Sequence, residues 1–284
     1  MKVLVVGASG MLGSAMFRVL SEMPGYEVFG TIRSQQAKRH FAPAIAANLL
    51  VGYDVENHDS LVRLFDCVRP KVVVNCIGLV KQLDHGQDPL YAIPINSMLP
   101  HRFSDLCSLV GARLIHVSTD CVFTGNKGKY CEDDPSDATD IYGKTKYLGE
   151  VANPHSITLR TSIIGHELEG SRSLLCWFLN QTDSCRGYTK AIFSGLPTVA
   201  LAQIVRDVVI PRPDLHGLYH VAASPISKYD LLSLIAEIYG KKISIVPDDT
   251  IIIDRSLDAN RFRLATGYTA PDWRALIELM KFYK

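Results

Sequence analysis

The feature that most constrains the fold of this chain is a glycine-rich turn close to its first residue. Residues 2–6 read Lys-Val-Leu-Val-Val, and Gly7, Gly10 and Gly13 follow at three-residue spacing before a helix-like run. Glycine is needed where a backbone turns tightly and where a helix packs closely on a strand. A helix that begins at such a turn presents free N–H groups and the positive end of its dipole, which bind phosphate. The turn therefore predicts a dinucleotide-binding βα unit.

The remaining sequence up to about residue 164 alternates short apolar β-branched runs with amphipathic stretches. Apolar runs of this kind suit strands that are buried on both faces of a parallel sheet. We expect strands at residues 2–6, 26–32, 48–53, 71–77, 112–118 and 157–164, and helices at 11–22, 58–68, 96–110 and 140–152. The predicted fold class is α/β, with a Rossmann-type doubly wound parallel sheet.

Beyond residue 165 the alternation loosens, and prolines separate shorter elements that include helices near 227–239 and 273–282. We therefore predict two parts. Residues 1–164 form the dinucleotide-binding domain, and residues 165–284 form mainly a smaller substrate-binding lobe, with one segment that returns to the Rossmann sheet. A ligand would lie between the two parts, at the carboxyl ends of the strands.

The end of the second expected strand favours NADPH as the cofactor. NAD sites usually place an acid here to bind the ribose hydroxyl, whereas this segment ends in Arg33 with Lys38 and Arg39 nearby. A guanidinium binds a 2′-phosphate through paired charge-assisted hydrogen bonds. A solvated surface arginine is the alternative, and NADH remains the second candidate cofactor. The residues expected at the cofactor are Gly7, Ser9, Gly10, Met11, Leu12, Gly13, Arg33, Asp54, Val55, Cys76, Ile77, Gly78, Ser118, Tyr142 and Lys146.

Two of these positions have simpler interpretations. Asp54 follows the third expected strand, where it could meet the adenine amino group or serve only as a turn carboxylate. Asn96 opens a long expected helix, where it could hold backbone or water in the site or serve only as a cap.

A tyrosine and a lysine one helical turn apart predict acid catalysis on a carbonyl group. Tyr142 and Lys146 share one helix face, and Thr119, with Ser118 beside it, follows a buried strand. A hydroxyl at the strand end would hold a carbonyl oxygen while the phenol protonates it. An ammonium about 4 Å away would lower the pKa of a phenol from about 10 to near 7. We therefore expect Thr119, Tyr142 and Lys146 to act together.

Composition excludes several other functions. The formal charge of +1 argues against a nucleic-acid-binding protein, which usually carries a basic excess. The seven cysteines include no C-x-x-C pair, so we expect no metal or redox motif. No apolar stretch approaches the length of about 18 residues that a transmembrane helix requires. The chain begins with a strand, which leaves no room for a signal peptide, and we expect a cytoplasmic protein.

These motifs together resemble an extended short-chain dehydrogenase/reductase, and within that group the dTDP-4-dehydrorhamnose reductases. The resemblance is carried by the glycine turn, Ser118-Thr119-Asp120-Cys121-Val122-Phe123, Tyr142-Gly143-Lys144-Thr145-Lys146, Leu159-Arg160-Thr161-Ser162 and Gly217-Leu218-Tyr219-His220-Val221-Ala222. It implies hydride transfer from NADPH to C4 of a 4-keto-6-deoxy sugar nucleotide, with Thr119, Tyr142 and Lys146 as the catalytic triad. A homodimer is a further expectation.

The expected substrate contacts are Lys81, Asp120, Cys121 and Ile163, with Gln82 beside the first of them. Ile163 stands where the family usually has tryptophan against the sugar, and Cys121 stands where it usually has tyrosine. These two departures concern the sugar more than the reaction. A surface loop is the alternative for Lys81.

Other functions of the same fold leave different signatures. Sugar-nucleotide dehydratases carry Thr-Asp-Glu, and Cys121 occupies the position of that glutamate, which argues against dehydration. The 4-epimerases favour an acidic residue near Arg33, and this sequence has none there. Epimerase/reductases that resemble GDP-fucose synthase carry a cysteine where Cys121 stands, so combined epimerisation and reduction stays open. Cys121 would need a cationic neighbour or a partner such as His166, and simple packing is the alternative. A non-catalytic nucleotide-binding regulatory subunit is the third candidate.

Overall fold

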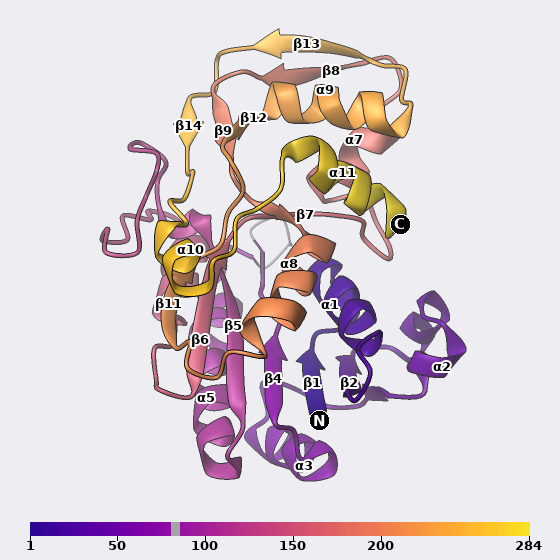
Figure 1. Ribbon diagram of the computed structural model, residues 1–284, viewed down its shortest axis with the longest axis vertical. Helices are drawn as coiled ribbons and strands as arrows, with labels where there is room; N and C mark the ends of the chain where they lie inside the picture. The colour runs from indigo at the N-terminus through magenta and orange to yellow at the C-terminus, as the bar shows by residue number, and fades with distance from the viewer. Residues whose placement is uncertain (81–85) are drawn as a thin grey trace.

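The computed structural model, which describes residues 1–80 and 86–284, confirms the α/β class and the parallel sheet (Figure 1). Every pairing between neighbouring strands of this sheet is parallel. The seven strands, in their order across the sheet, are β11 (Gly217–His220), β6 (Ser156–Thr161), β5 (Arg113–Thr119), β4 (Val72–Asn75), β1 (Lys2–Val6), β2 (Glu27–Ile32) and β3 (Leu49–Val51).

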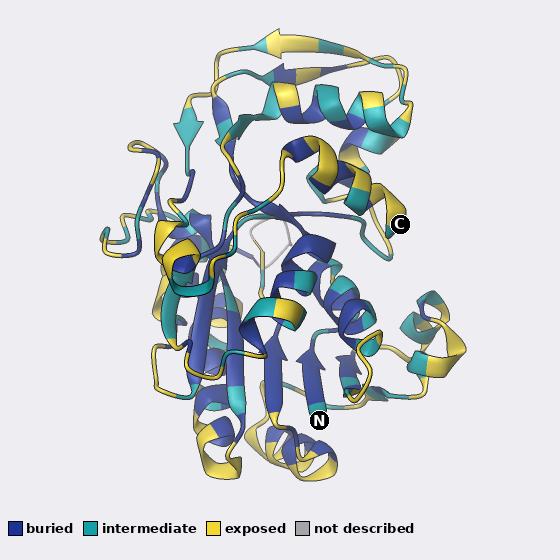
Figure 2. Cartoon of the chain, in the orientation of Figure 1, coloured by how far each residue is buried: buried dark blue, intermediate teal, exposed yellow. Residues whose placement is uncertain are grey.

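Helices cover both faces of the sheet, so its central strands are almost wholly buried (Figure 2). The residues of β1 alternate between the two cores, because successive side chains of a strand point to opposite faces. Val3 and Val5 pack into the core shared with α1 (Met11–Ser21) and α8 (Thr198–Ile204), whereas Leu4 and Val6 pack into the core shared with α3 (His58–Val68) and α5 (Leu99–Val110). The helices and helical turns of this part are α1 (Met11–Ser21), η1 (Gln35–His40), α2 (Pro43–Ala46), α3 (His58–Val68), α4 (Pro89–Ala92), η2 (Ile93–Met98), α5 (Leu99–Val110), η3 (Asp120–Val122), α6 (Ile141–Leu148), α8 (Thr198–Ile204) and η4 (Val205–Val209).

The C-terminal lobe lies beyond the carboxyl ends of the sheet strands, at the top of Figure 1. Short strands pair within it, and its helices pack around them. These elements are β7 (Ile163–Ile164), α7 (Leu174–Asn180), β8 (Ser184–Tyr188), β9 (Ala191–Phe193), β10 (Leu196–Pro197), β12 (Ile226–Ser227), α9 (Lys228–Tyr239), β13 (Ser244–Asp248), β14 (Ile253–Asp254) and α11 (Trp273–Phe282). The helix α10 (Asn260–Thr266) instead packs against β11, at the left of Figure 1. In the described part of the chain, no helix is both long and apolar enough to cross a membrane.

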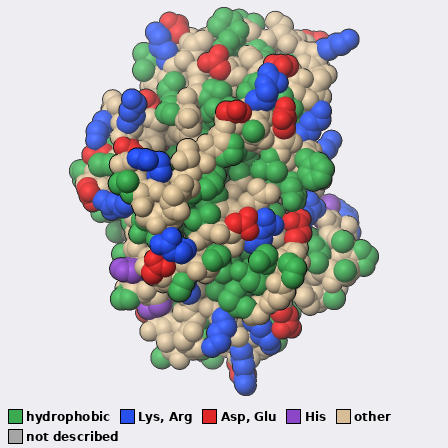
Figure 3. All heavy atoms as spheres, viewed as in Figure 1, with side chains coloured by type: hydrophobic (Ala, Val, Ile, Leu, Met, Phe, Trp, Pro, Cys, Tyr) green, Lys and Arg blue, Asp and Glu red, His purple; other side chains and the backbone are tan. Residues whose placement is uncertain are grey.

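One segment from beyond residue 165 joins the main sheet. α8 packs against α1, and β11 then pairs with β6 to form the edge of the seven-stranded sheet. One hydrophobic core consequently runs from α1 into the C-terminal lobe, where Leu231 and Trp273 belong to it. On the face shown in Figure 3, acidic and basic side chains are interspersed, with no surface of a single charge.

Most expected elements differ by one to three residues from the observed bounds, and three differ by more than a shift of their ends. The strand expected at 157–164 divides into β6 and β7, because the Ser162 carbonyl accepts the N–H of Leu196 from β10. The helix expected at 96–110 begins at Pro89 and passes through the π-helical turn η2, a distortion that fits Pro94 and Pro100, which have no N–H to donate. The helix expected at 140–152 ends at Leu148.

Candidate active site

The turn between β1 and α1 has the geometry that a bound phosphate requires. Gly7 has a φ of +89°, and a Cβ on Gly13 would lie 2.0 Å from the carbonyl oxygen of Gly7, so helix and strand meet too closely for a side chain. α1 begins after Gly10 and has no acid in its first turn. The side chain of Leu12 is buried, so only the main chain of this residue could contact a phosphate. Ser9 and Met11 lie on either side of Gly10 in the same turn. These residues fit the phosphates of a dinucleotide.

The adenosine side of the expected site is open to solvent. Arg33 follows β2 directly and is exposed. Asp54 is also exposed, and its Oδ1 accepts the N–H of Glu56 at 2.9 Å, which is the geometry of a turn carboxylate. Val55 packs partly against the core under α3 and α5. Arg33 therefore lies where a 2′-phosphate could reach it, whereas the turn interpretation of Asp54 agrees with its observed hydrogen bond.

The structure brings Thr119 and Tyr142 together. Thr119 is the last residue of β5, and α6 begins after Asp140, whose carboxylate accepts the N–H of Gly143 at 2.7 Å. Thr119 lies beside Tyr142, close enough that its hydroxyl lowers the pKa of the phenol, and Thr119 Oγ1 donates to Asp120 Oδ1 at 3.2 Å. The hydroxyl of Ser118 instead donates to Glu150 Oε1 at 2.7 Å. Of the two neighbouring hydroxyls, Thr119 is therefore the one at the phenol.

The pKa of Tyr142 corrects one expectation from the sequence. Burial raises this pKa above the ordinary value of 10, and the neighbouring Cys121, Asp120 and Asp140 raise it further, while the hydroxyl of Thr119 lowers it. The ammonium of Lys146 donates to the main-chain carbonyl of Val117 at 2.8 Å. The phenol is therefore fully protonated at neutral pH, and its pKa is not brought near 7.

Lys146 is buried beside the segment that follows β4. A Cβ on Gly78 would lie 3.9 Å from its Nζ, so the backbone at Gly78 runs next to the ammonium. Burial lowers the pKa of Lys146 to about 8. Burial also raises the pKa of Cys76 to about 12, so this thiol is neutral. Cys76, Ile77 and Gly78 therefore run along the side of the site occupied by Lys146.

Asn96 holds this segment in place. Its Oδ1 accepts the N–H of Leu79 at 2.8 Å, and its Nδ2 donates to the carbonyl of Leu79 at 3.0 Å and to Thr145 Oγ1 at 3.2 Å. Asn96 lies inside η2 and is not a helix cap, which decides between its two interpretations.

Asp120 and Cys121 lie next to the triad, and a residue missed in the sequence joins them there. Burial raises the pKa of Asp120, which the guanidinium of Arg255 and hydrogen bonds from Cys121, Thr119 and Ser162 oppose. Arg255 Nη1 lies 3.8 Å from Cys121 Sγ, and its Nε donates to the carbonyl of Phe123 at 2.7 Å. Arg255 follows β14 in the C-terminal lobe, so no nearby motif marks it.

The other expected substrate contacts are less informative. Ile163 pairs with Leu196 between β7 and β10 and packs partly against the main core. Lys81 and Gln82 lie outside the described residues.

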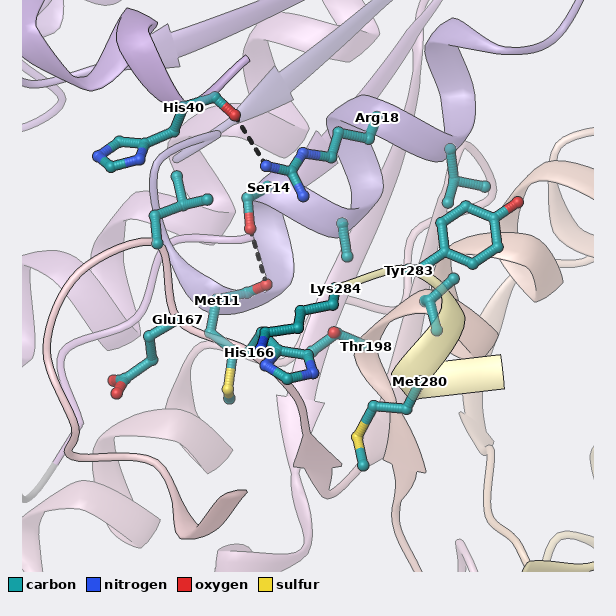
Figure 4. A pocket seen from close by; sticks show the side chains of 14 residues that line it. Met11, Ser14, Arg18, His40, His166, Glu167, Thr198, Met280, Tyr283 and Lys284 are labelled. Carbon is teal, nitrogen blue, oxygen red and sulfur yellow. Dashed lines mark hydrogen bonds between the residues drawn. The ribbon is translucent and has the colours of Figure 1, made fainter. Parts of the chain in front are cut away.

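A separate cavity of about 240 Å³ lies beside α1, lined among others by Met11, Arg18, His166 and Lys284 (Figure 4). His166 is hydrogen-bonded to Tyr239 at 2.9 Å and lines this cavity. The structure therefore gives Cys121 a cationic neighbour in Arg255, not a partner in His166. Within residues 1–80 and 86–284, no cluster of histidine, cysteine and acidic side chains could hold a metal ion.

Comparisons with known proteins extend over nearly the whole chain. A family model described as the RmlD substrate binding domain matches residues 1–279. A dTDP-4-dehydrorhamnose reductase of Aggregatibacter actinomycetemcomitans is 25% identical, with 99% of each chain covered. The spore coat polysaccharide biosynthesis protein SpsK of Bacillus subtilis is 30% identical, over 86% of this chain and 82% of the relative. Methionine adenosyltransferase 2 subunit beta of Xenopus laevis is 26% identical, over 84% of this chain and 72% of the relative.

Solved structures show the same architecture. A dTDP-4-dehydrorhamnose reductase from Clostridium acetobutylicum has a TM-score of 0.82 at 24% identity, with 100% of this chain and 99% of that chain covered. A dTDP-4-dehydrorhamnose reductase from Bacillus anthracis in complex with NADP has a TM-score of 0.80 at 20% identity, with the same coverage.

Proposed function

The chain belongs to the family of the RmlD substrate binding domain, as its motifs predicted, and from this premise we propose that it is an NADPH-dependent reductase of a keto group on a nucleotide-activated sugar. The observation that carries the proposal is the position of Thr119 at the end of β5 beside Tyr142, with Lys146 on the same helix. Relatives named for dTDP-4-dehydrorhamnose reduction support a 4-keto-6-deoxy sugar nucleotide as the substrate class.

The phosphates of the cofactor would lie at the first turn of α1, where Gly7, Gly10 and Gly13 leave room and unpaired N–H groups are available. Arg33 would bind the 2′-phosphate, and the complex of the Bacillus anthracis relative with NADP supports this choice of cofactor. When bound, NADPH would supply the hydride to the carbonyl carbon.

The side chains of this protein would hold the carbonyl oxygen and deliver the proton. Thr119 would orient the oxygen, and Tyr142 would donate its phenolic proton to that oxygen as negative charge develops on it. Because burial keeps Tyr142 protonated, the acid form is fully populated at neutral pH. Lys146 would hold the nicotinamide ribose and stabilise the phenolate that remains after transfer. Arg255 and Asp120 would contact the substrate, and the C-terminal lobe, which carries Arg255, would take part in substrate binding.

The decisive experiment measures NADPH oxidation with a panel of 4-keto sugar nucleotides that differ in base and sugar substituents. We expect turnover with at least one member and a strong preference for NADPH over NADH. Binding of NADPH without turnover of any member would contradict the proposal. That outcome would favour a non-catalytic regulatory subunit, the function suggested by the similarity to methionine adenosyltransferase 2 subunit beta.

Combined epimerisation and reduction is a second candidate, because Arg255 Nη1 lies 3.8 Å from Cys121 Sγ. A guanidinium at this distance stabilises a thiolate, which can remove a proton from the carbon next to a keto group. Enzyme and substrate are incubated in deuterated water with NADP⁺, which blocks reduction. A plain reductase leaves deuterium at C3 and C5 at the level of the enzyme-free control. Incorporation that is lost in Cys121→Ala would establish the second candidate.

A further inference from the structure

A group of buried polar side chains lies behind the helix that carries Tyr142 and Lys146, and the reaction described above does not use it. Glu150 lies four residues after Lys146, and its side chain is only 10% exposed. Arg160 on β6 binds both carboxylate oxygens, Nε to Oε1 at 2.7 Å and Nη2 to Oε2 at 2.6 Å. Ser118 on β5 donates a third hydrogen bond to Oε1 at 2.7 Å. The carboxylate is therefore fixed between α6, β5 and β6.

A close approach of two backbone segments brings Glu150 to this position. A Cβ on Gly149 would lie 1.9 Å from the carbonyl oxygen of Asn96, so α6 ends where only glycine can pass η2. The next residue then enters the space under β5 and β6. The backbone of Asn96 therefore fixes where Glu150 enters, while its side chain binds Leu79 in the active-site segment.

Arg160 has no second acid on its other side. Its Nη1 lies 3.2 Å from Nε2 of His220, whose Nδ1 lies 3.0 Å from the carbonyl oxygen of Tyr130. A carbonyl only accepts, so Nδ1 of His220 carries the proton and Nε2 accepts from Arg160. Burial also lowers the pKa of His220 to about 3, so this histidine is neutral. In the described part of the chain, Glu150 is the one carboxylate paired with Arg160.

The charge of the Glu150 carboxylate also acts on Lys146. Among the described residues, the thiol of Cys76 acts on this ammonium as well, and the ammonium acts on the imidazole of His116. Burial keeps both neutral, because it raises the pKa of the thiol to about 12 and lowers that of the imidazole well below its ordinary value. The negative charge of Glu150 opposes the effect of burial on Lys146 and raises its pKa.

We propose that Glu150 is a positioning residue of the active site. It holds the end of β5 through Ser118, next to the Val117 carbonyl that binds Lys146, and supplies negative charge near this ammonium. Arg160 fixes the carboxylate in this position. A buried ion pair seldom stabilises a fold more than apolar residues of the same size would, so stability alone gives little reason for this pair. The inference rests on the proposed function only in the role given to Lys146.

The test measures the charge on Lys146 directly and through activity. The pKa of Lys146 is followed by NMR of ¹³C-labelled lysine, with the signal assigned by its loss in Lys146→Met. The pH dependence of kcat/KM is measured in parallel. Three variants change the ion pair. Glu150→Gln removes the negative charge, Glu150→Asp keeps it, and Glu150→Gln/Arg160→Met removes the whole ion pair. Glu132→Gln is the matched control, because this buried carboxylate accepts the N–H of His220 but does not act on Lys146.

Glu150→Gln should lower the pKa of Lys146 by about 1 unit or more, and the decline of kcat/KM at alkaline pH should move down by the same amount. Glu150→Asp should largely restore both values, and Glu132→Gln should leave both unchanged. The double variant leaves no unpaired buried charge, and it should lower the pKa by less than Glu150→Gln does, because it also removes the positive charge of Arg160. An unchanged pKa of Lys146 in Glu150→Gln and in the double variant would overturn the inference. The NMR result stands even if no keto sugar is reduced, so failure of the inference and failure of the proposed function are distinguishable.

Discussion

Replacing Lys146 by methionine should stabilise the folded protein at neutral pH while it removes activity. Lys146 is 4% exposed, and burial lowers its pKa from 10.5 to about 8. A group whose pKa falls on folding binds protons less well in the folded state, so its charge opposes folding wherever it stays protonated. Methionine has a similar length and no charge, and it removes this opposing contribution.

The magnitude follows from the two pKa values and depends on pH. Below pH 8 the lysine is protonated in both the folded and the unfolded state, and the difference of pKa corresponds to about 3 kcal/mol against folding. Above pH 8 the folded protein releases the proton and the unfolded chain keeps it until about pH 10.5, so the penalty declines. Loss of the hydrogen bond to Val117 costs about 1 kcal/mol at any pH. Lys146→Met should therefore be more stable than wild type by about 2 kcal/mol at pH 7.

Urea unfolding of the wild type and the variant at pH 7 and pH 10 measures this difference. The advantage of Lys146→Met should shrink by about 2–3 kcal/mol between the two pH values, because the wild type loses its buried charge. Lys144→Met is the control, since Lys144 is exposed on the same helix and its replacement should change stability by less than about 0.5 kcal/mol at either pH. A difference between Lys146→Met and wild type that is the same at both pH values would refute the reasoning.

Three further predictions concern the reaction, the cofactor and the turn. Tyr142→Phe should lower turnover by roughly 10²–10⁴-fold with NADPH affinity nearly unchanged. Steady-state kinetics under conditions in which chemistry limits the rate measure this, and near wild-type turnover would show that Tyr142 is not the proton donor. Arg33→Ala should weaken NADPH binding by about 1.5–3 kcal/mol and NADH binding far less. Fluorescence titrations measure both affinities, and an equal loss of affinity for the two cofactors would mean that Arg33 does not contact the 2′-phosphate. Gly13→Ala should destabilise the fold by about 1–3 kcal/mol and abolish cofactor binding, because its Cβ would lie 2.0 Å from the carbonyl oxygen of Gly7. Gly10→Ala, whose nearest contact is 3.4 Å, should unfold at nearly the wild-type temperature, and equal destabilisation by both would contradict the prediction.

The parts of the site that lie on single elements could be predicted from the sequence. The glycine turn follows from the order of strand and helix, and the pairing of Thr119 with Tyr142 follows from a strand end and one face of a helix. Glu150 stands four residues after Lys146, a spacing that would place both on one face of a helix. The sequence does not show that α6 ends at Leu148, before Glu150 is reached.

The remaining features depend on distant contacts or on burial. Arg255 reaches Cys121 across 134 residues of sequence, and no local pattern encodes such a contact. The pKa of Tyr142 was predicted in the wrong direction, because a charge-pair estimate from spacing omits the desolvation that dominates in the folded protein. The π-helical turn before α5 also depends on proline positions that periodicity does not reveal.

The pairing of β6 with β11 has a consequence for how the protein acquires its structure during synthesis. Arg160 on β6 can contact His220 only after 60 further residues have been synthesised. Until that segment has left the ribosome, β6 is an unpaired edge that can bind the wrong strand. Residues 1–164, which the sequence suggests as one domain, should therefore not fold cooperatively without the residues that follow them. A fragment that ends at residue 164 should aggregate, whereas a chain released after residue 220 already holds every strand of the sheet.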